Sequence, residues 1–382
     1  MNTTQFILEH RQDNIQTLAL QRSRYPSVDI DFALQQIQGW QLTQKKLPQI
    51  AQINNWLYPK RISTEQASSE TTAIYKQQLI SQLNIQSLAD LTGGMGIDCF
   101  YMSQHAQQTI YVEKEQELCN LATHNFSITN KNIQVINSTA EQFLNNTNTL
   151  DCIYLDPARR NTNGQKVFLL EQCQPNIAEL YNTLINKAKY ILIKLSPMLD
   201  IQQALHTLNN TQQIHTIALQ GEVKELLFLI EKDFNQEPTF FAANLLTNQP
   251  TLQFTHSQLL NAQTNYATQP LSFIYEPNPA IMKTEAYKLL SQKYNLLKLA
   301  PNSHLFTADQ LIRNFPGKIF QVISHANKKN LNKQHLSVIA KNYPLTAQQI
   351  KNKYKLQESD SQFLIATQLQ QQPIMLLTQI IR

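Results

Sequence analysis

Glycines and acidic residues gather in one short turn of this sequence, and their spacing indicates a ligand-binding loop. Only seven glycines occur in 382 residues, yet Gly93, Gly94 and Gly96 lie together in the run Asp90-Leu91-Thr92-Gly93-Gly94-Met95-Gly96-Ile97-Asp98. A strand is expected before this run and a helix after it. Backbone that approaches a ligand closely, or adopts positive φ, leaves no room for a Cβ atom. A purely structural turn is the alternative interpretation.

The type of ligand follows from what surrounds the glycines. A dinucleotide-binding turn would have a third glycine three residues after Gly96, where this chain has Cys99. Acidic residues at both ends suit a cationic amino-acid ligand better than a diphosphate, and S-adenosylmethionine carries an ammonium and a sulfonium. The residues predicted to hold this cofactor are Asp90, Thr92, Gly93, Gly94, Gly96 and Asp98.

Two later strand ends supply candidate contacts for the adenosine of that cofactor. Glu113 ends the second predicted strand, about 20 residues after the loop, where a carboxylate can accept both ribose hydroxyls. The alternative for Glu113 is a solvated charge at a strand end. Thr139 and Ala140, in Ser138-Thr139-Ala140, follow the third strand and are predicted to contact the adenine.

The fourth predicted strand ends in Asp156 and Pro157, followed by Ala158, Arg159 and Arg160. Proline stops the strand and stiffens the turn, and ligands of open α/β sheets bind outside the carboxyl ends of the strands. We therefore expect Asp156, with Pro157, to form the catalytic turn. Arg159 and Arg160 are predicted to bind substrate phosphate or, equally, to pair with carboxylates. An ordinary Asp-Pro turn is the structural alternative.

Two more polar groups have alternative roles. Lys194 and Ser196, at the end of the fifth predicted strand, either face the substrate or terminate the strand. Ser68, Ser69 and Thr72 precede a helix and can cap it.

The elements that must position these residues alternate between strand and helix. The β-prone runs are residues 87–91, 109–113, 133–136, 151–155, 190–195, 214–219 and 225–230. Strands separated by helices predict a mainly parallel sheet. The segment 220–224 is too short for a helical crossover, so the last strand is expected to be antiparallel. The predicted fold class is α/β, with a Rossmann-like seven-stranded sheet, and residues 239–254 add a hairpin at its edge.

The rest of the chain predicts smaller parts around that sheet. Apolar residues at helical spacing in 30–57 predict an N-terminal helical region over residues 1–60. The catalytic domain is placed at 61–263. Two small α+β domains follow, at 264–316 and 317–382, with a helix at 280–294 and a strand at 296–299.

Composition excludes several classes of protein. The polar N-terminus has no signal-peptide pattern and no apolar run reaches the length of a membrane span, so a cytoplasmic protein is expected. The four cysteines are scattered without a CxxC pair, and the nine histidines show no metal-ligand spacing, so neither disulfides nor a bound metal is expected.

Charge is unevenly distributed along the chain. From residue 264 onward there are 14 lysines and arginines against 5 aspartates and glutamates, a net charge of +9, whereas the rest has 18 against 22, or −4. Such asymmetry suggests a polyanionic partner for the C-terminal part. A basic surface that only interacts with solvent is the alternative.

These motifs together resemble class I methyltransferases that have a ferredoxin-like insert and a C-terminal THUMP-like domain. The resemblance rests on residues 65–70 (EQASSE), 72–76 (TAIYK), 90–98, 156–160 (DPARR), 194–200 (KLSPMLD), 275–280 (YEPNPA), 299–306 (LAPNSHLF) and 315–317 (FPG). It implies S-adenosylmethionine as methyl donor and, because THUMP domains are associated with RNA modification, a base in tRNA or rRNA as substrate. It also implies an alternative role for the segment with Ser68, Ser69 and Thr72, which in related methyltransferases covers the cofactor.

The motifs leave the methylated atom open. Methyltransferases that act on exocyclic amines have an aromatic residue shortly after Asp-Pro-Pro, where this chain has Ala158 and Arg159, and no cysteine nucleophile for pyrimidine C5 follows Pro157 directly. The alternatives are a non-catalytic RNA-binding protein with a methyltransferase fold, or a methyltransferase acting on protein or a small molecule.

Overall fold

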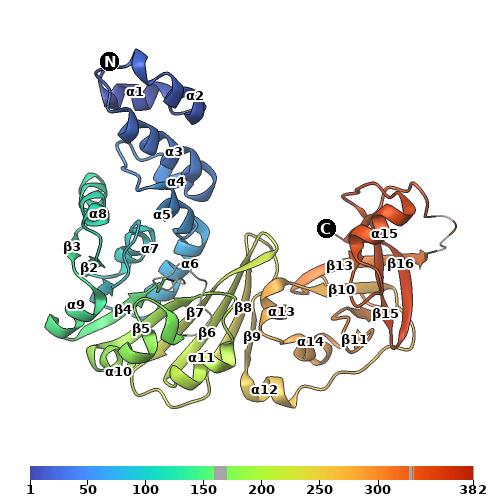
Figure 1. Ribbon diagram of the computed structural model, residues 1–382. Coiled ribbons are helices and arrows are strands. Elements are labelled where there is room, and N and C mark those ends of the chain that lie inside the picture. Colours follow the sequence, from blue (N-terminus) through green and yellow to red (C-terminus); the bar gives the residue numbers. More distant parts are fainter. Residues whose placement is uncertain (159–169, 327–328, 330, 382) are drawn as a thin grey trace. The chain divides into compact units, whose positions relative to one another are not determined.

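The N-terminal part of the chain is helical, as predicted. The computed structural model describes residues 1–158, 170–326, 329 and 331–381, which Figure 1 traces from end to end. The first helices are α1 (Thr3–His10), α2 (Ile15–Leu20), α3 (Ile30–Lys46) and α4 (Pro48–Ala51), with the short 3-10 turn η1 (Arg22–Arg24). The side chains of Asn2, Asn14 and Asp29 accept hydrogen bonds from free backbone N–H groups at the starts of α1, α2 and α3, which fixes where these helices begin.

Strands and helices alternate in the next part. The strands are β1 (Ser87–Asp90), β2 (Gln108–Glu113), β3 (Ile133–Asn137), β4 (Leu150–Leu155) and β5 (Ala188–Leu195). The helices are α5 (Arg61–Gln66), α6 (Glu70–Ser81), α7 (Ile97–Met102), α8 (Gln116–Ile128), α9 (Ala140–Asn146), α10 (Ile177–Lys187) and α11 (Ile201–Thr207), with the turns η2 (Ser103–His105) and η3 (Leu170–Gln172). Each predicted strand is present here.

Parallel pairing brings the predicted site residues to one edge of this sheet. β1 pairs in parallel with β2 on one side and with β4 on the other, and β4 pairs in parallel with β5. Ligands of such sheets bind at the carboxyl ends of the strands. The residues that follow β1, β2, β4 and β5 therefore lie at a common edge, and α10 packs against β5 as Figure 1 shows.

The sheet changes direction after β5. Hydrogen-bonded neighbours follow the order β3-β2-β1-β4-β5-β7-β6-β8-β9, with β6 (Thr211–Leu219), β7 (Glu222–Glu231), β8 (Thr239–Leu245) and β9 (Leu252–Thr255), and α12 (His256–Asn261) comes next. Gln220 and Gly221, between β6 and β7, both have positive φ, 54° and 83°. This two-residue turn is typical of β-hairpins, so β7 runs antiparallel to β6 as expected. β8 and β9 form the antiparallel hairpin predicted at the edge.

The C-terminal strands form one continuous sheet that spans both predicted α+β modules. Its order is β11-β12-β10-β13-β16-β15-β14. The strands are β10 (Phe273–Pro277), β11 (Leu297–Lys298), β12 (Phe306–Ala308), β13 (Gly317–His325), β14 (Ser337–Ala340), β15 (Gln362–Leu369) and β16 (Gln372–Ile381). β13 pairs with both β10 and β16, so it joins the segments before and after residue 317. A Cβ on Gly317 would lie 2.1 Å from the carbonyl oxygen of Glu276, which explains the glycine at this junction.

One helix prediction in this part is wrong. The single helix expected at 280–294 is two helices, α13 (Pro279–Lys283) and α14 (Tyr287–Tyr294). Glu285 between them has a φ of 56°, in the left-handed region, and this ends the first helix. The helix α15 (Ala347–Tyr354) lies between β14 and β15 in the chain.

Contacts between residues divide the chain into two compact units. The first consists of residues 1–211 and 228–235, and the second of residues 212–227 and 236–382. Within the first unit, Leu47, Trp56 and Tyr58 from the N-terminal part share a buried cluster with Met95 and Ile97 of the glycine turn. No helix among the described residues is long and apolar enough to cross a membrane.

Candidate active site

The glycine turn between β1 and α7 needs its glycines for two different reasons. Gly94 and Gly96 have φ values of 53° and 79°, a conformation that side chains disfavour. Gly93 is required for packing, because an added Cβ would lie 2.1 Å from the ring of Tyr111. The hydroxyl of Tyr111 donates to the carbonyl of Gly94 at 2.6 Å. The turn is thus held in shape by the neighbouring strand β2.

Glu113, at the end of β2, lies directly beside this turn. One of its carboxylate oxygens accepts from the backbone N–H of Gly94 at 3.0 Å, and the other from the backbone N–H of Glu115 at 2.9 Å. The side chain is half-buried. Its position at the carboxyl end of β2 and its carboxylate chemistry fit a ribose-binding role, and its hydrogen bond to Gly94 also stabilises the turn.

Asp90 and Thr92 connect the glycine turn to the end of β4. The buried Asp90 carboxylate accepts from the backbone N–H of Thr92 at 3.0 Å, and burial holds its pKa well above the usual value. The hydroxyl of Thr92 in turn accepts from the backbone N–H of Asp156 at 2.6 Å. The cofactor turn and the predicted catalytic turn are therefore joined by a single side chain.

Asp156 is the exposed member of an ion pair with Lys194. Lys194 Nζ lies 2.5 Å from Asp156 Oδ2, and the exposed fractions of the two side chains are 8% and 33%. Lys194 comes from the end of β5, which pairs with β4. Pro157 is buried and Ala158 is exposed. Lys194 thus fixes the Asp156 carboxylate from the β5 side. The rest of the carboxylate faces solvent, where a substrate could reach it.

A buried network lies behind this pair. The carboxylate of Asp98 accepts from Ser68 Oγ and from the hydroxyl of Tyr154, each at 2.7 Å. It also lies 3.2 Å from Lys76 Nζ and 3.9 Å from Lys194 Nζ. Burial raises the pKa of Asp98, but the attraction of the two lysines outweighs burial and holds this pKa below its usual value. Asp98 is therefore an ionised group surrounded by side chains of this chain.

Lys76 and Tyr154 were not predicted as site residues. Lys76 is fully buried on α6, on the same side as Ala73 and Ile80. A lysine at helical spacing among apolar residues was a usable signal, because a buried ammonium requires a carboxylate partner. Tyr154 gave no such signal, since a tyrosine in an apolar strand is ordinary.

The other predicted residues have local hydrogen bonds. Thr139 caps α9 by accepting from the backbone N–H of Gln142 at 3.2 Å, and Ala140 is buried behind it. Ser196 accepts from the backbone N–H of Met198 at 3.2 Å. Arg159 and Arg160 lie outside the described residues.

The segment before α6 caps the helix, which is one of the two roles predicted for it. Ser69 caps α6 by accepting from the backbone N–H of Thr72 at 3.3 Å. Ser68 instead enters the buried network, where Lys194 Nζ lies 3.0 Å from its hydroxyl.

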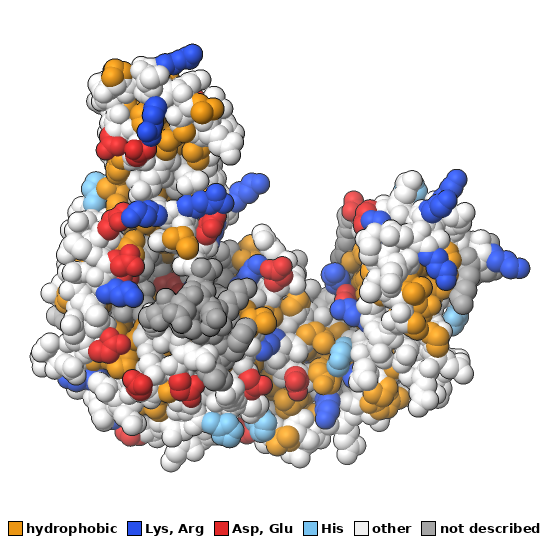
Figure 2. Space-filling view, viewed as in Figure 1, with side chains coloured by type: hydrophobic (Ala, Val, Ile, Leu, Met, Phe, Trp, Pro, Cys, Tyr) orange, Lys and Arg blue, Asp and Glu red, His pale blue; other side chains and the backbone are white. Residues whose placement is uncertain are grey.

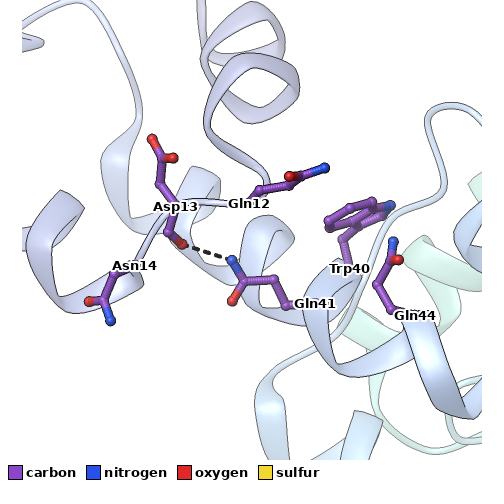
Figure 3. Close-up of a pocket in the computed structure, with 6 residues that line it drawn as sticks. All are labelled: Gln12, Asp13, Asn14, Trp40, Gln41 and Gln44. Atoms are coloured by element: carbon purple, nitrogen blue, oxygen red, sulfur yellow. Dashed lines mark hydrogen bonds between the residues drawn. The ribbon is translucent and has the colours of Figure 1, made fainter.

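A shallow hollow of about 470 Å³ lies on the N-terminal helices (Figure 3). Its lining residues are Gln12, Asp13, Asn14, Trp40, Gln41 and Gln44, none of them a predicted site residue. The amide of Gln41 donates to the carbonyls of Arg11 and Asp13, and the Asp13 carboxylate lies 2.7 Å from His10 Nδ1. This amide-rich surface offers no catalytic constellation.

The residues at the sheet edge fit S-adenosylmethionine. A Cβ built on Gly94 would meet only the carbonyl oxygen of Thr92 at 3.8 Å, so the turn presents open backbone on this side. Glu113, the predicted acceptor for the ribose, lies beside it, and the backbone N–H of Asp156 donates to the hydroxyl of Thr92. Among the described residues, no group of three or more His, Cys, Asp or Glu could hold a metal ion.

Comparisons with known proteins agree with this architecture. Residues 273–316 match a ferredoxin-like domain family and residues 317–379 a THUMP domain-like family. No curated protein matches the sequence. The crystal structure of a "putative methyltransferase" from Porphyromonas gingivalis W83 superposes with a TM-score of 0.88 at 28% identity, covering 100% of this chain and 98% of that one.

Two other solved structures are much more distant. An rRNA methylase from Streptococcus thermophilus has a TM-score of 0.32 at 10% identity, covering 42% of this chain and 95% of that one. SMU.1697c from Streptococcus mutans, in complex with SAH, has a TM-score of 0.33 at 12% identity, covering 41% and 96%. The chain thus has an α/β fold with a mixed sheet, shared with the P. gingivalis protein over its full length, and a C-terminal ferredoxin-like and THUMP-like region.

Proposed function

We propose that this protein is an S-adenosylmethionine-dependent methyltransferase that modifies a base in tRNA or rRNA. The observation that carries the proposal is the hydrogen bond from the backbone of Asp156 to Thr92. This hydrogen bond joins the glycine turn to Asp156, whose carboxylate is buried only in part. The donor and the acceptor of a methyl group would therefore meet there. The full-length likeness to the P. gingivalis protein supports the same reaction class.

Each site residue then has a role. Asp90, Thr92, Gly93, Gly94, Gly96 and Glu113 would hold the cofactor, with Thr139 and Ala140 on the adenine side and Asp98 behind the turn. The bound cofactor supplies a reactive sulfonium methyl, so the protein needs mainly to position the acceptor. Asp156 would accept a hydrogen bond, or the proton, from the substrate's nucleophile. Pro157 would keep its turn rigid, and Arg159, Arg160, Lys194 and Ser196 would line the substrate side.

RNA as substrate rests on the C-terminal part. A THUMP domain-like family matches there, and the net charge of +9 from residue 264 onward favours a polyanion. We retain the division into residues 1–60, 61–263, 264–316 and 317–382 as part of the proposal. A tRNA or rRNA substrate would place the reaction in the cytoplasm.

Two measurements test the proposal in sequence. Calorimetry with S-adenosylmethionine and its demethylated product S-adenosylhomocysteine should show binding of both. Transfer of labelled methyl groups should then occur to RNA from cells that lack this protein, with one modified nucleoside identified by mass spectrometry. Transfer only to protein or metabolite fractions would refute RNA as substrate, and cofactor binding without any transfer would favour a non-catalytic RNA-binding protein.

A further inference from the structure

Lys194 occupies an unusual place between two carboxylates. Its Nζ lies 2.5 Å from Asp156 Oδ2 and 3.9 Å from Asp98 Oδ2. Ser68 Oγ, which donates to Asp98, is 3.0 Å from the same Nζ. Lys194 therefore connects the partly exposed carboxylate to the buried one.

Each of the two carboxylates has a lysine beside it. Lys76 lies 3.2 Å from Asp98 and 3.4 Å from Ser68 Oγ, whereas a cation next to Asp156 is Lys194. Among the described residues, Lys76 is fully buried, and Lys194 and Asp98 are nearly so. Removing one member of a buried pair leaves its partner's charge uncompensated, and such a charge acts strongly on whatever binds nearby.

We propose that Lys194 is a positioning residue that holds Asp156 in place and neutralises its charge next to the transferable methyl group. The inference rests on the proposed function, because it takes the cofactor sulfur to lie near Asp156. Together, the Lys194 ammonium and the Asp156 carboxylate have no net charge. They should therefore contribute about equally to the affinities for S-adenosylmethionine, whose sulfur is positively charged, and S-adenosylhomocysteine, whose sulfur is uncharged. This lets the product leave about as readily as the donor binds.

The test is the ratio of the two affinities, which needs no methyl acceptor. In Lys194→Met, Asp156 loses the ammonium group that lies next to it. The affinity for S-adenosylmethionine should then rise relative to that for S-adenosylhomocysteine by about 10- to 100-fold, as expected for one unit charge acting over about 6 to 12 Å at an effective dielectric constant of about 20. A residue that only supports the fold would change both affinities by the same factor.

Three variants serve as controls. Lys194→Arg keeps the positive charge and should keep the wild-type ratio. Lys194→Met combined with Asp156→Asn removes both charges and should restore it. Lys76→Met removes an equal buried charge that contacts Asp98 rather than Asp156, so its ratio should change much less. Thermal unfolding shows whether Lys194→Met is folded. If it is not, Lys194→Gln makes the same charge change with a polar side chain.

The outcomes separate this inference from the proposed function. A ratio that changes in Lys194→Met and returns in the double variant supports the role of Lys194. An unchanged ratio in Lys194→Met, or equal changes for Lys194→Met and Lys76→Met, would overturn it while leaving the methyltransferase proposal intact. A wild-type protein that binds neither compound would instead refute the proposed function, and the inference with it.

Discussion

Glu113 is the residue whose chemistry is most directly tied to cofactor binding. Its carboxylate accepts from the backbone of Gly94 and would accept the ribose hydroxyls as well. Glu113→Ala should weaken S-adenosylmethionine binding by about 10- to 150-fold, since a hydrogen bond to a charged group is worth roughly 1.5–3 kcal/mol. Calorimetry measures the change. Glu115→Ala removes an exposed carboxylate two residues away and should leave the affinity within a few fold; equal losses in the two variants would contradict the ribose role.

Asp156 is the residue expected to affect turnover most strongly. Asp156→Asn keeps the shape of the side chain and an oxygen for Lys194, but it removes the carboxylate. Turnover at saturating S-adenosylmethionine should fall at least about 100-fold, in addition to the weaker S-adenosylmethionine binding expected when the Lys194 charge is no longer neutralised by Asp156. Single-turnover methyl transfer is the measurement. Asp151→Asn changes the same residue type near the start of β4, where its carboxylate accepts from the backbone of Gln86 and Ser87, and should leave turnover near wild type. Near wild-type turnover in Asp156→Asn would make Asp156 only a turn residue.

At the scale of elements, the positions of the strands could be predicted from the sequence, but the side-chain contacts between elements could not. A buried strand carries its own apolar run, so β1 to β5 could be placed from local sequence. The reason for Gly93 could not, because the clash with Tyr111 depends on how β2 lies beside the turn. The network around Asp98 likewise joins residues from α6, α7, β4 and β5 that no spacing along the chain connects.

The pairing of strands in the C-terminal sheet likewise could not be predicted from local sequence. The boundary suggested by Pro316 and Gly317 is a real turn, yet Gly317 opens a strand that pairs with both neighbouring segments. Turn residues mark where the chain changes direction, not whether hydrogen bonds continue across the turn. The predicted boundary at residues 316 and 317 coincides with the boundary between the two family matches, while hydrogen bonds between strands continue across it.

Lys46, at the end of α3, connects the N-terminal helices to the segment that precedes the candidate site. Its Nζ donates to the carbonyls of Thr64 and Glu65 at 3.1 and 2.6 Å, at the end of α5, close to Ser68 of the network. Burial, reinforced by Lys194, lowers the pKa of Lys46 to about 8, against the opposing attraction of Glu65 and Asp98. The side chain thus loses its proton well below the pH at which an unfolded lysine does.

This pKa predicts how stability depends on pH. Between about pH 8 and 10.5 the unfolded chain still holds the Lys46 proton while the folded chain has lost it, so the free energy of unfolding should gain from this group as pH rises through that window. Lys46→Met should remove the gain. Denaturant unfolding of both proteins at pH 7.5, 9 and 10.5 gives the difference, with Lys45→Met as an exposed control. A wild-type minus Lys46→Met difference that stays constant or falls with pH would contradict the buried-lysine interpretation.

At the scale of the whole molecule, charge separates the C-terminal part from the rest. Figure 2 shows Lys and Arg side chains on the part that carries α15. Three exposed lysines belong to one local group there. The backbone N–H of Lys333 donates to the carbonyl of Tyr354 at 2.9 Å, and Lys353 and Lys355 flank Tyr354 in the chain. The backbones of these three residues are therefore close together, which makes the group a candidate for contacts with RNA phosphates.

Changing Lys333, Lys353 and Lys355 together to Gln should therefore weaken RNA binding in a salt-dependent way. Each contact between a lysine and a single-strand phosphate contributes about −0.7 to the slope of log affinity against log salt, so the slope should flatten by up to about 2. The measurement is binding of unfractionated tRNA across a salt series, with S-adenosylmethionine affinity as the check on folding. Lys45, Lys189 and Lys232 are also exposed, and Lys189 and Lys232 are joined by a backbone hydrogen bond of 2.8 Å. Changing these three to Gln removes the same charge outside the C-terminal part and should leave the slope nearly unchanged. Equal flattening in both triple variants would mean that RNA responds only to net charge, and an unchanged slope in the C-terminal variant would mean that this lysine group does not contact the RNA backbone.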